Sequence, residues 1–178
     1  MKKIFFLAAI SSALVWSACG GNKTETVADV VPAGMQAIDL KDQGLPLKIN
    51  IPDSTNGVAA VTETPEGVEV KLGMHFDIII NSASAEESDI TKYRPILEAA
   101  DELPKTFTQP DSATLRWEVN ISDSPMCHFY HTVKIGTTTY FVRDNNNNPD
   151  NAFKKEEVDK MLNSATSLRE RPADAPKA

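Results

Sequence analysis

The sequence has 178 residues, of which 41% are apolar, and its formal net charge at pH 7 is −7. This length is enough for one domain of ordinary size with a hydrophobic core. The acidic balance repels phosphate backbones and anionic headgroups, so it argues against nucleic acid as a partner.

The first eighteen residues have the three parts of a secretory signal peptide. Lys2 and Lys3 give a positive start, residues 4–16 are apolar apart from two serines, and Ser17 and Ala18 are small. The apolar run of 13 residues is shorter than the roughly 20 residues that span a hydrocarbon core. An uncleaved membrane helix is therefore the weaker interpretation.

The end of this segment, Trp16-Ser17-Ala18-Cys19, resembles the lipobox of bacterial lipoproteins. In that motif a large apolar residue and two small residues precede a cysteine. The resemblance implies that residues 1–18 are removed and that Cys19 carries a diacylglyceryl group, with a further acyl chain on its new amino group. Lipoboxes usually have Leu, Val or Ile where Trp16 stands, and the relaxed form is similar to those of Bacteroidota. The alternative is an ordinary secretory signal cut near Ala18 or Gly20, with Cys19 incidental.

The residue after the cysteine bears on which membrane the protein is attached to. In the lipoproteins that this segment resembles, an aspartate there often retains the protein at the inner membrane. Gly20 stands at this place, so attachment to the outer membrane is favoured. Two or three acyl chains would hold the chain firmly, because each buried methylene contributes about 0.8 kcal/mol. Cys127 is the remaining cysteine, and without a disulfide partner we expect a buried thiol there.

We expect four segments along the chain. They are the signal peptide 1–18, a flexible tether over 19–34, one α+β domain over 35–168 and a disordered tail over 169–178. The tether begins with two glycines and shows no period, and the tail is rich in proline and charge.

Strand-like alternation dominates the domain. Residues 45–52 predict a half-buried strand, placed at a sheet edge because Pro46 and Pro52 lie in it. A hairpin is predicted around residues 65–67. From 68 to 80 every even position is apolar, and the parity does not change at Gly73. This pattern predicts either one strand that bends at Gly73 or two strands that share a sheet face.

Further strands are predicted over 114–121, 126–135 and 138–143, the last two joined by a hairpin at 136–137. A helical stripe within 82–105 is interrupted by Pro95, and a final helix is predicted over 152–165. The order predicts an α+β fold with a mainly antiparallel sheet of about six or seven strands and two principal helices packed on it.

Cys127, His128 and His131 look like metal ligands in the sequence. On a strand, however, Cys127 and His131 point to one face and His128 to the other, so we predict no shared ion. His131 is interpreted as a hydrogen-bonded residue at the core edge. The other face of this strand is expected to lie under a helix or else to bind a partner. It carries Met126, His128, Tyr130, Thr132 and Lys134.

The segment from Asn146 to Glu157 imitates the spacing of a calcium-binding EF-hand loop, with oxygen-bearing residues at Asn148 and Asp150. The first place lacks aspartate and the sixth holds Asn151 in place of glycine. We therefore interpret it as a polar loop that ends in a helix cap.

No glycine-rich phosphate loop and no G-x-S-x-G elbow occurs in the sequence. We assign no catalytic, cofactor-binding or metal residue and expect no cofactor, so the predicted site is lipid attachment at Cys19. The sequence favours a non-catalytic binding domain, anchored to the membrane, whose partner is an unknown envelope protein or small ligand. The alternative is a lipid-anchored hydrolytic or metal-dependent enzyme that brings His75 together with His128 or His131 and a carboxylate.

Overall fold

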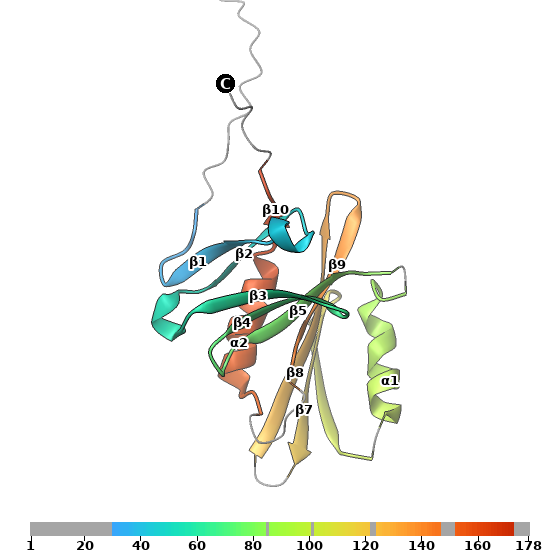
Figure 1. Cartoon of the computed structure of the whole chain (residues 1–178). Helices are drawn as coiled ribbons and strands as arrows, with labels where there is room; N and C mark the ends of the chain where they lie inside the picture. The colour runs from blue at the N-terminus through green and yellow to red at the C-terminus, as the bar shows by residue number, and fades with distance from the viewer. Residues whose placement is uncertain (1–29, 85, 101, 122–123, 147–151, 173–178) are drawn as a thin grey trace, which may run out of the picture. The chain divides into compact units, whose positions relative to one another are not determined.

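The alternating segments of the sequence pair into two antiparallel sheets (Figure 1). The computed structural model describes residues 30–84, 86–100, 102–121, 124–146 and 152–172. The strands are β1 (Met35–Asp39), β2 (Leu47–Pro52), β3 (Ala59–Thr64), β4 (Gly67–Leu72), β5 (Asp77–Ser82), β6 (Lys105–Asp111), β7 (Thr114–Ile121), β8 (Ser124–Ile135), β9 (Thr138–Asp144) and β10 (Arg169–Glu170). The helices are α1 (Tyr93–Ala99) and α2 (Lys155–Thr166), with single helical turns η1 (Lys41–Gln43), η2 (Ser54–Asn56) and η3 (Ile90–Lys92).

The larger sheet has seven strands in the order β3-β4-β5-β9-β8-β7-β6, and the smaller one has the order β1-β2-β10. The predicted α+β class, with a mainly antiparallel sheet and two helices, is confirmed. The prediction that the strand over 45–52 lies at an edge is wrong, because β2 is the central strand of the smaller sheet. Pro46 precedes β2 and Pro52 ends it, so neither proline interrupts its hydrogen bonding.

The first residues of the segment expected as a tail form a strand. Arg169 and Glu170 form β10, which pairs antiparallel with Lys48 and Leu47 of β2. Just beyond β10, the Arg171 N–H donates to the carbonyl of Pro46, and its guanidinium pairs with Asp39 at 2.7 Å. The domain therefore extends beyond residue 168.

The apolar residues at every even position from 68 to 80 belong to two strands whose side chains share one sheet face. This was one of the two predicted alternatives. β4 and β5 form a hairpin in which Val70 lies opposite Ile78. Gly73 lies in the turn between them with a φ of 63°, a conformation that favours glycine. Because the turn conserves the parity, both strands direct their even-numbered side chains into the same core.

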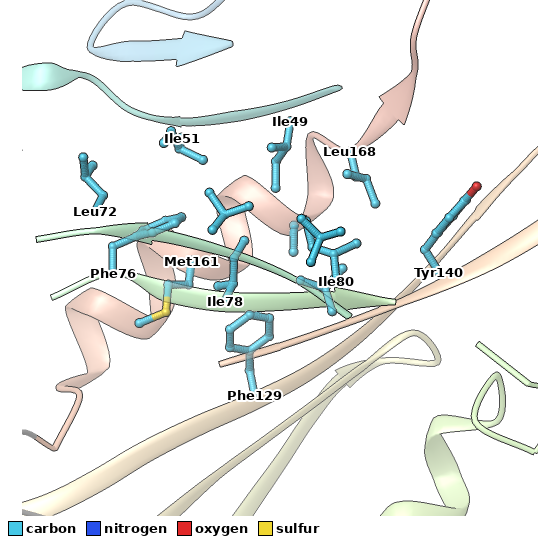
Figure 2. Packing of buried hydrophobic residues seen from close by; sticks show 14 of the residues in the cluster. Ile49, Ile51, Leu72, Phe76, Ile78, Ile80, Phe129, Tyr140, Met161 and Leu168 are labelled. Carbon is cyan, nitrogen blue, oxygen red and sulfur yellow. The ribbon is translucent and has the colours of Figure 1, made fainter. Parts of the chain in front are cut away.

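This first core fills the space between one face of the larger sheet, helix α2 and β2 (Figure 2). Ile49 and Ile51 of β2 face Ile78 of β5, with Met161 of α2 and Phe129 of β8 packed beside them. All five side chains are fully buried. The smaller sheet thus packs through β2 against α2, and α2 packs in turn against the long strand β8.

A second core covers the opposite face of the sheet under η3 and α1. Tyr130 of β8 lies at its centre and contacts the rings of Tyr93, Trp117 and Phe141 at centroid distances of 4.7–5.0 Å. The expectation that a helix covers this face of β8 is confirmed for Tyr130. The helix itself is shorter than predicted, because Pro95 lies in the first turn of α1 and the chain before it forms only the single turn η3.

No helix in the described parts of the chain is both long and apolar enough to cross a membrane. Three strands, β1, β6 and β10, were not predicted. Strand β6 lies at the outer edge of the larger sheet, and among the described strands β7 is its one neighbour.

Candidate functional site

The three residues that resembled metal ligands lie as strand geometry required, on two faces of β8. Cys127 belongs to the first core. His128 lies on the other side and stacks on Trp117, with ring centroids 5.0 Å apart and planes 19° apart. His131 is hydrogen-bonded through Nδ1 to the hydroxyl of Thr114 at 3.0 Å, and burial lowers its pKa. The prediction of a hydrogen-bonded His131 at the core edge is confirmed.

His128 has a partner that the sequence did not reveal. Its Nδ1 donates to Oδ2 of Asp144 at 2.7 Å, and Oδ1 of the same carboxylate accepts the backbone N–H of Phe129 at 2.8 Å. Asp144 is the last residue of β9, and since Arg143 lies opposite Tyr130, Asp144 comes beside Phe129 and accepts its N–H through the side chain. Both side chains are buried. The alternation of β9 places Asp144 on the face of Val142 and Tyr140, so it signals a buried carboxylate that requires a partner. It does not signal His128, whose position on β8 alternates with that of Cys127.

The third histidine lies elsewhere. His75, in the turn between β4 and β5, pairs with Oε1 of Glu157 at 2.7 Å, and its own side chain is exposed. Each of His75, His128 and His131 therefore has a different partner, and they do not form a common centre. Among the residues that the structure describes, no three His, Cys, Asp or Glu side chains are grouped so as to hold a metal ion.

The EF-hand-like segment falls partly outside the described residues, which exclude Asn148, Asp150 and Asn151. Glu157, at its twelfth place, caps α2 by accepting the N–H of Lys154 at 2.8 Å. Cys19 also lies outside the described residues.

A pocket of about 200 Å³ lies between α2 and the β6–β8 side of the larger sheet. The register places its polar side chains on one sheet face, since Glu118 lies opposite both Thr106 and Cys127, and Thr108 lies opposite Arg116. Trp117 and His128 alternate with these residues, so their side chains start from the other face of the sheet. The lining residues are Thr106, Thr108, Arg116, Trp117, Glu118, Cys127, His128 and Lys155.

The pocket contains charges of both signs. Arg116 pairs with Asp159 of α2 at 2.6 Å, which ties β7 to the helix. Lys155, the first residue of α2, contributes a second positive charge, and Glu118 faces the same space with a negative one. Burial, reinforced by the Glu118 carboxylate, raises the pKa of Cys127 to about 11. The thiol is therefore protonated at neutral pH and is not a ready nucleophile.

Strand β6 forms the rim of this pocket and the outer edge of the sheet. The N–H of Asn120 donates to the carbonyl of Pro104 at 3.4 Å, which identifies these two residues as a hydrogen-bonded pair. Because such pairs alternate along antiparallel strands, the backbone groups of Thr106 and Thr108 face β7, and those of Phe107 face away from the sheet. The pocket and an outward-facing backbone segment are thus adjacent.

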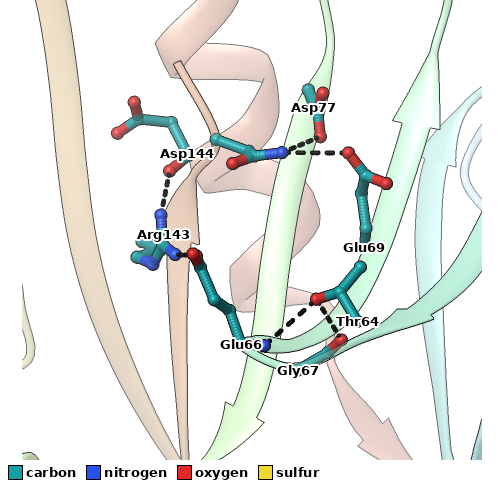
Figure 3. A network of polar contacts seen from close by, with 8 residues as sticks. Thr64, Glu66, Gly67, Glu69, Asp77, Arg143 and Asp144 are labelled. Carbon is teal, nitrogen blue, oxygen red and sulfur yellow. Dashed lines mark hydrogen bonds and ion pairs between the residues drawn. The ribbon is translucent and has the colours of Figure 1, made fainter. Parts of the chain in front are cut away.

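A separate polar network ties β4, β5 and β9 together on the other face of the sheet (Figure 3). Arg143 pairs with Glu66, and the side-chain amide of Asn145 donates to Glu69 at 2.9 Å and to Asp77 at 3.4 Å. Burial raises the pKa of Asp77, while a hydrogen bond from Lys71 opposes that shift. These groups pair with one another across three strands, so we interpret the network as structural.

The fold and the pocket define an α+β domain whose antiparallel sheet carries a polar pocket beside an edge strand. No model of a known protein family matches the chain, and comparison with curated proteins finds no match.

Proposed function

We propose that the protein is a lipid-anchored component of the bacterial cell envelope whose domain binds a partner protein and catalyses no reaction. Residues 16–19 support the anchor, because they resemble a lipobox with Cys19 as the acylated residue. Gly20 favours the outer membrane as its site. The partner contributes an extended segment that pairs with β6.

The observation that carries the binding proposal is the position of the pocket beside the edge strand. An extended segment that adds to a sheet edge gains affinity from main-chain hydrogen bonds, and pockets for alternate side chains give specificity. The outward N–H and C=O of Phe107 can make the main-chain hydrogen bonds, and the side chains of Thr106 and Thr108 line the pocket. Strand β6 therefore provides both the hydrogen-bonding edge and part of the pocket.

The size and charge of the pocket favour a partner's side chain over a whole small ligand. Pockets for drug-sized molecules measure about 300–1,000 Å³, and this one measures about 200 Å³. Lys155 and Glu118 offer one charge of each sign beside the threonine hydroxyls. A polar or charged side chain on the added strand fits this environment.

The enzyme alternative receives less support from the same geometry. The His128–Asp144 pair is buried and bonded to the backbone of Phe129. The Cys127 thiol is held in its protonated form by its raised pKa. The three histidines do not converge on a carboxylate.

Photo-crosslinking in intact cells tests the binding proposal. We expect benzoylphenylalanine in place of Thr108 to give a discrete crosslinked protein. The same replacement at Thr62 should not give it. Thr62 is the matched control, because it is an exposed threonine on β3, the strand at the opposite edge of the sheet.

A charge reversal in the pocket makes this test more specific. Lys155→Glu is expected to lower the yield of the Thr108 crosslink severalfold. It should leave the fold intact, since a carboxylate is well accommodated in the first turn of a helix. Equal crosslinking from positions 62 and 108, or none from either, would contradict the proposed binding edge.

A further inference from the structure

Three loops meet at one end of the domain (Figure 1). They are residues 32–34 before β1, residues 53–58 around η2, and residues 73–75 between β4 and β5. The N–H of Asp53 donates to the carbonyl of Gly34 at 3.0 Å. A Cβ on Gly73 would lie 3.1 Å from the carbonyl oxygen of Asn56, and one on Gly57 would lie 3.5 Å from the backbone N of Gly73. The loops therefore touch through their backbones.

The side chains that follow the two glycines point into solvent. Val58 is 90% exposed and Met74 is 72% exposed, although both are large and apolar. Gly57 and Gly73 have φ values of 126° and 63°, a conformation that residues with a side chain rarely adopt. Neither position is therefore readily replaced by a residue whose side chain would shield Val58 or Met74 from solvent. From Val31 onward, Val58 and Met74 are the two most exposed large apolar side chains among the described residues. They lie on loops that contact each other.

This end also has few charges. Charged residues make up 24% of the chain, but the twelve residues of the three loops contain one, Asp53. The Asp53 carboxylate accepts both the N–H and the hydroxyl of Thr55 at 3.0 and 2.5 Å. His75 is held by Glu157 at 2.7 Å. The three loops themselves therefore offer little repulsion to an anionic bilayer, and the carboxylate beside them, Glu157, is paired with His75.

The chain enters the domain at this same end. Gly34 belongs to the first of the three loops and lies fifteen residues after Cys19. A chain of that length reaches at most about 50 Å even when fully extended. Acyl chains on Cys19 would therefore keep Gly34 within about 50 Å of the bilayer that holds the anchor.

We propose that this loop end lies against the anchoring bilayer, with Val58 and Met74 inserted at the boundary between headgroups and acyl chains. The inference rests on the proposed acylation of Cys19. Side chains that insert at this depth add apolar burial to the anchor and fix the orientation of the domain.

A fluorescent probe on the mature chain, purified from the membranes of the cells that produce it, tests this orientation. Met74→Cys is labelled with the polarity-sensitive dye NBD and reconstituted into vesicles of phosphatidylethanolamine and phosphatidylglycerol. Some of the acyl chains carry bromine, which quenches nearby dyes. Cys127 gives little background, because it is buried.

The matched control is Pro65→Cys, an exposed position in the turn between β3 and β4. It lies at the opposite end of the same hairpin, about 20 Å away for six residues of strand. We expect a blue-shifted emission at position 74 and at least twofold stronger quenching than at position 65. Val58→Cys, labelled in the same way, should behave like position 74.

Flotation separates the two ways in which the idea can fail. If the chain does not float with the vesicles, the anchor is absent and the orientation is overturned with it. If the chain floats and positions 58, 65 and 74 are quenched alike, the anchor stands and the proposed orientation is wrong.

Discussion

Asp144→Ala is expected to lower the free energy of unfolding by about 3–5 kcal/mol, since each buried donor left unpaired costs about 1–3 kcal/mol. The substitution removes the acceptor of both the His128 ring N–H and the Phe129 backbone N–H. Urea unfolding followed by tryptophan fluorescence measures this effect. Trp117 is the one tryptophan beyond residue 18 and stacks on His128, so its emission reports on this site.

Asp144→Asn separates hydrogen bonding from side-chain volume. The amide oxygen can still accept the N–H of Phe129, and the amide N–H can donate to Nδ1 of His128 in its other neutral tautomer. We therefore expect a loss of about 1 kcal/mol, as for a weakened hydrogen bond. Glu63→Ala, at an exposed carboxylate of β3, should stay within about 0.5 kcal/mol of the parent. Equal losses for alanine and asparagine at position 144 would show that the two hydrogen bonds are not what stabilises this site.

Gly67→Ala is the second substitution with a large expected effect. Gly67 opens β4 with a φ of 135°, and an added Cβ would lie 2.5 Å from the carbonyl oxygen of Ile80 on β5. Both atoms belong to paired strands, so the contact is relieved only if β4 and β5 separate. Backbone strain and overpacking each cost about 1–3 kcal/mol. We expect a combined loss of about 3 kcal/mol or more in urea unfolding.

Gly136→Ala is the control for this clash. Gly136 also has a positive φ, 60°, but a Cβ added there would have no neighbour within 4 Å. The strain of the left-handed conformation alone costs about 1–2 kcal/mol. If the two alanine variants are equally stable, the close approach of Gly67 to Ile80 does not constrain the β4–β5 pairing.

Alternation predicted those parts of the fold in which one face of a strand is apolar throughout. The even-numbered residues of β4 and β5 pack in one core on both sides of Gly73, so their parity was visible before any pairing was known. Strand β6 was missed for the converse reason. Phe107 is its one apolar side chain apart from Pro110, and at the sheet edge it needs no more.

The position of β2 was mistaken because proline was taken as a mark of an edge strand. Its two prolines lie before and at the end of the strand. Strand β10, two residues long, supplies the second neighbour. A partner of that length leaves no periodic signal in a sequence.

The candidate site depends on register, which a single sequence does not reveal. Thr106, Glu118 and Cys127 lie on three strands and become neighbours only when β6, β7 and β8 pair as observed. The partnership of His128 with Asp144 likewise requires β9 to end beside Phe129. The alternation of β8 did predict which residues share a face, and for that reason a shared metal ion was rejected.

Mass spectrometry of the mature N-terminus in the membrane fraction tests the central claim, that Cys19 carries the anchor, most directly. We predict a first residue of Cys19 with the added mass of a diacylglyceryl group, and a Cys19→Ala variant that is lost from the membrane fraction. A mature chain without acyl mass, or a variant that is processed and fractionates like the parent, would contradict the claim.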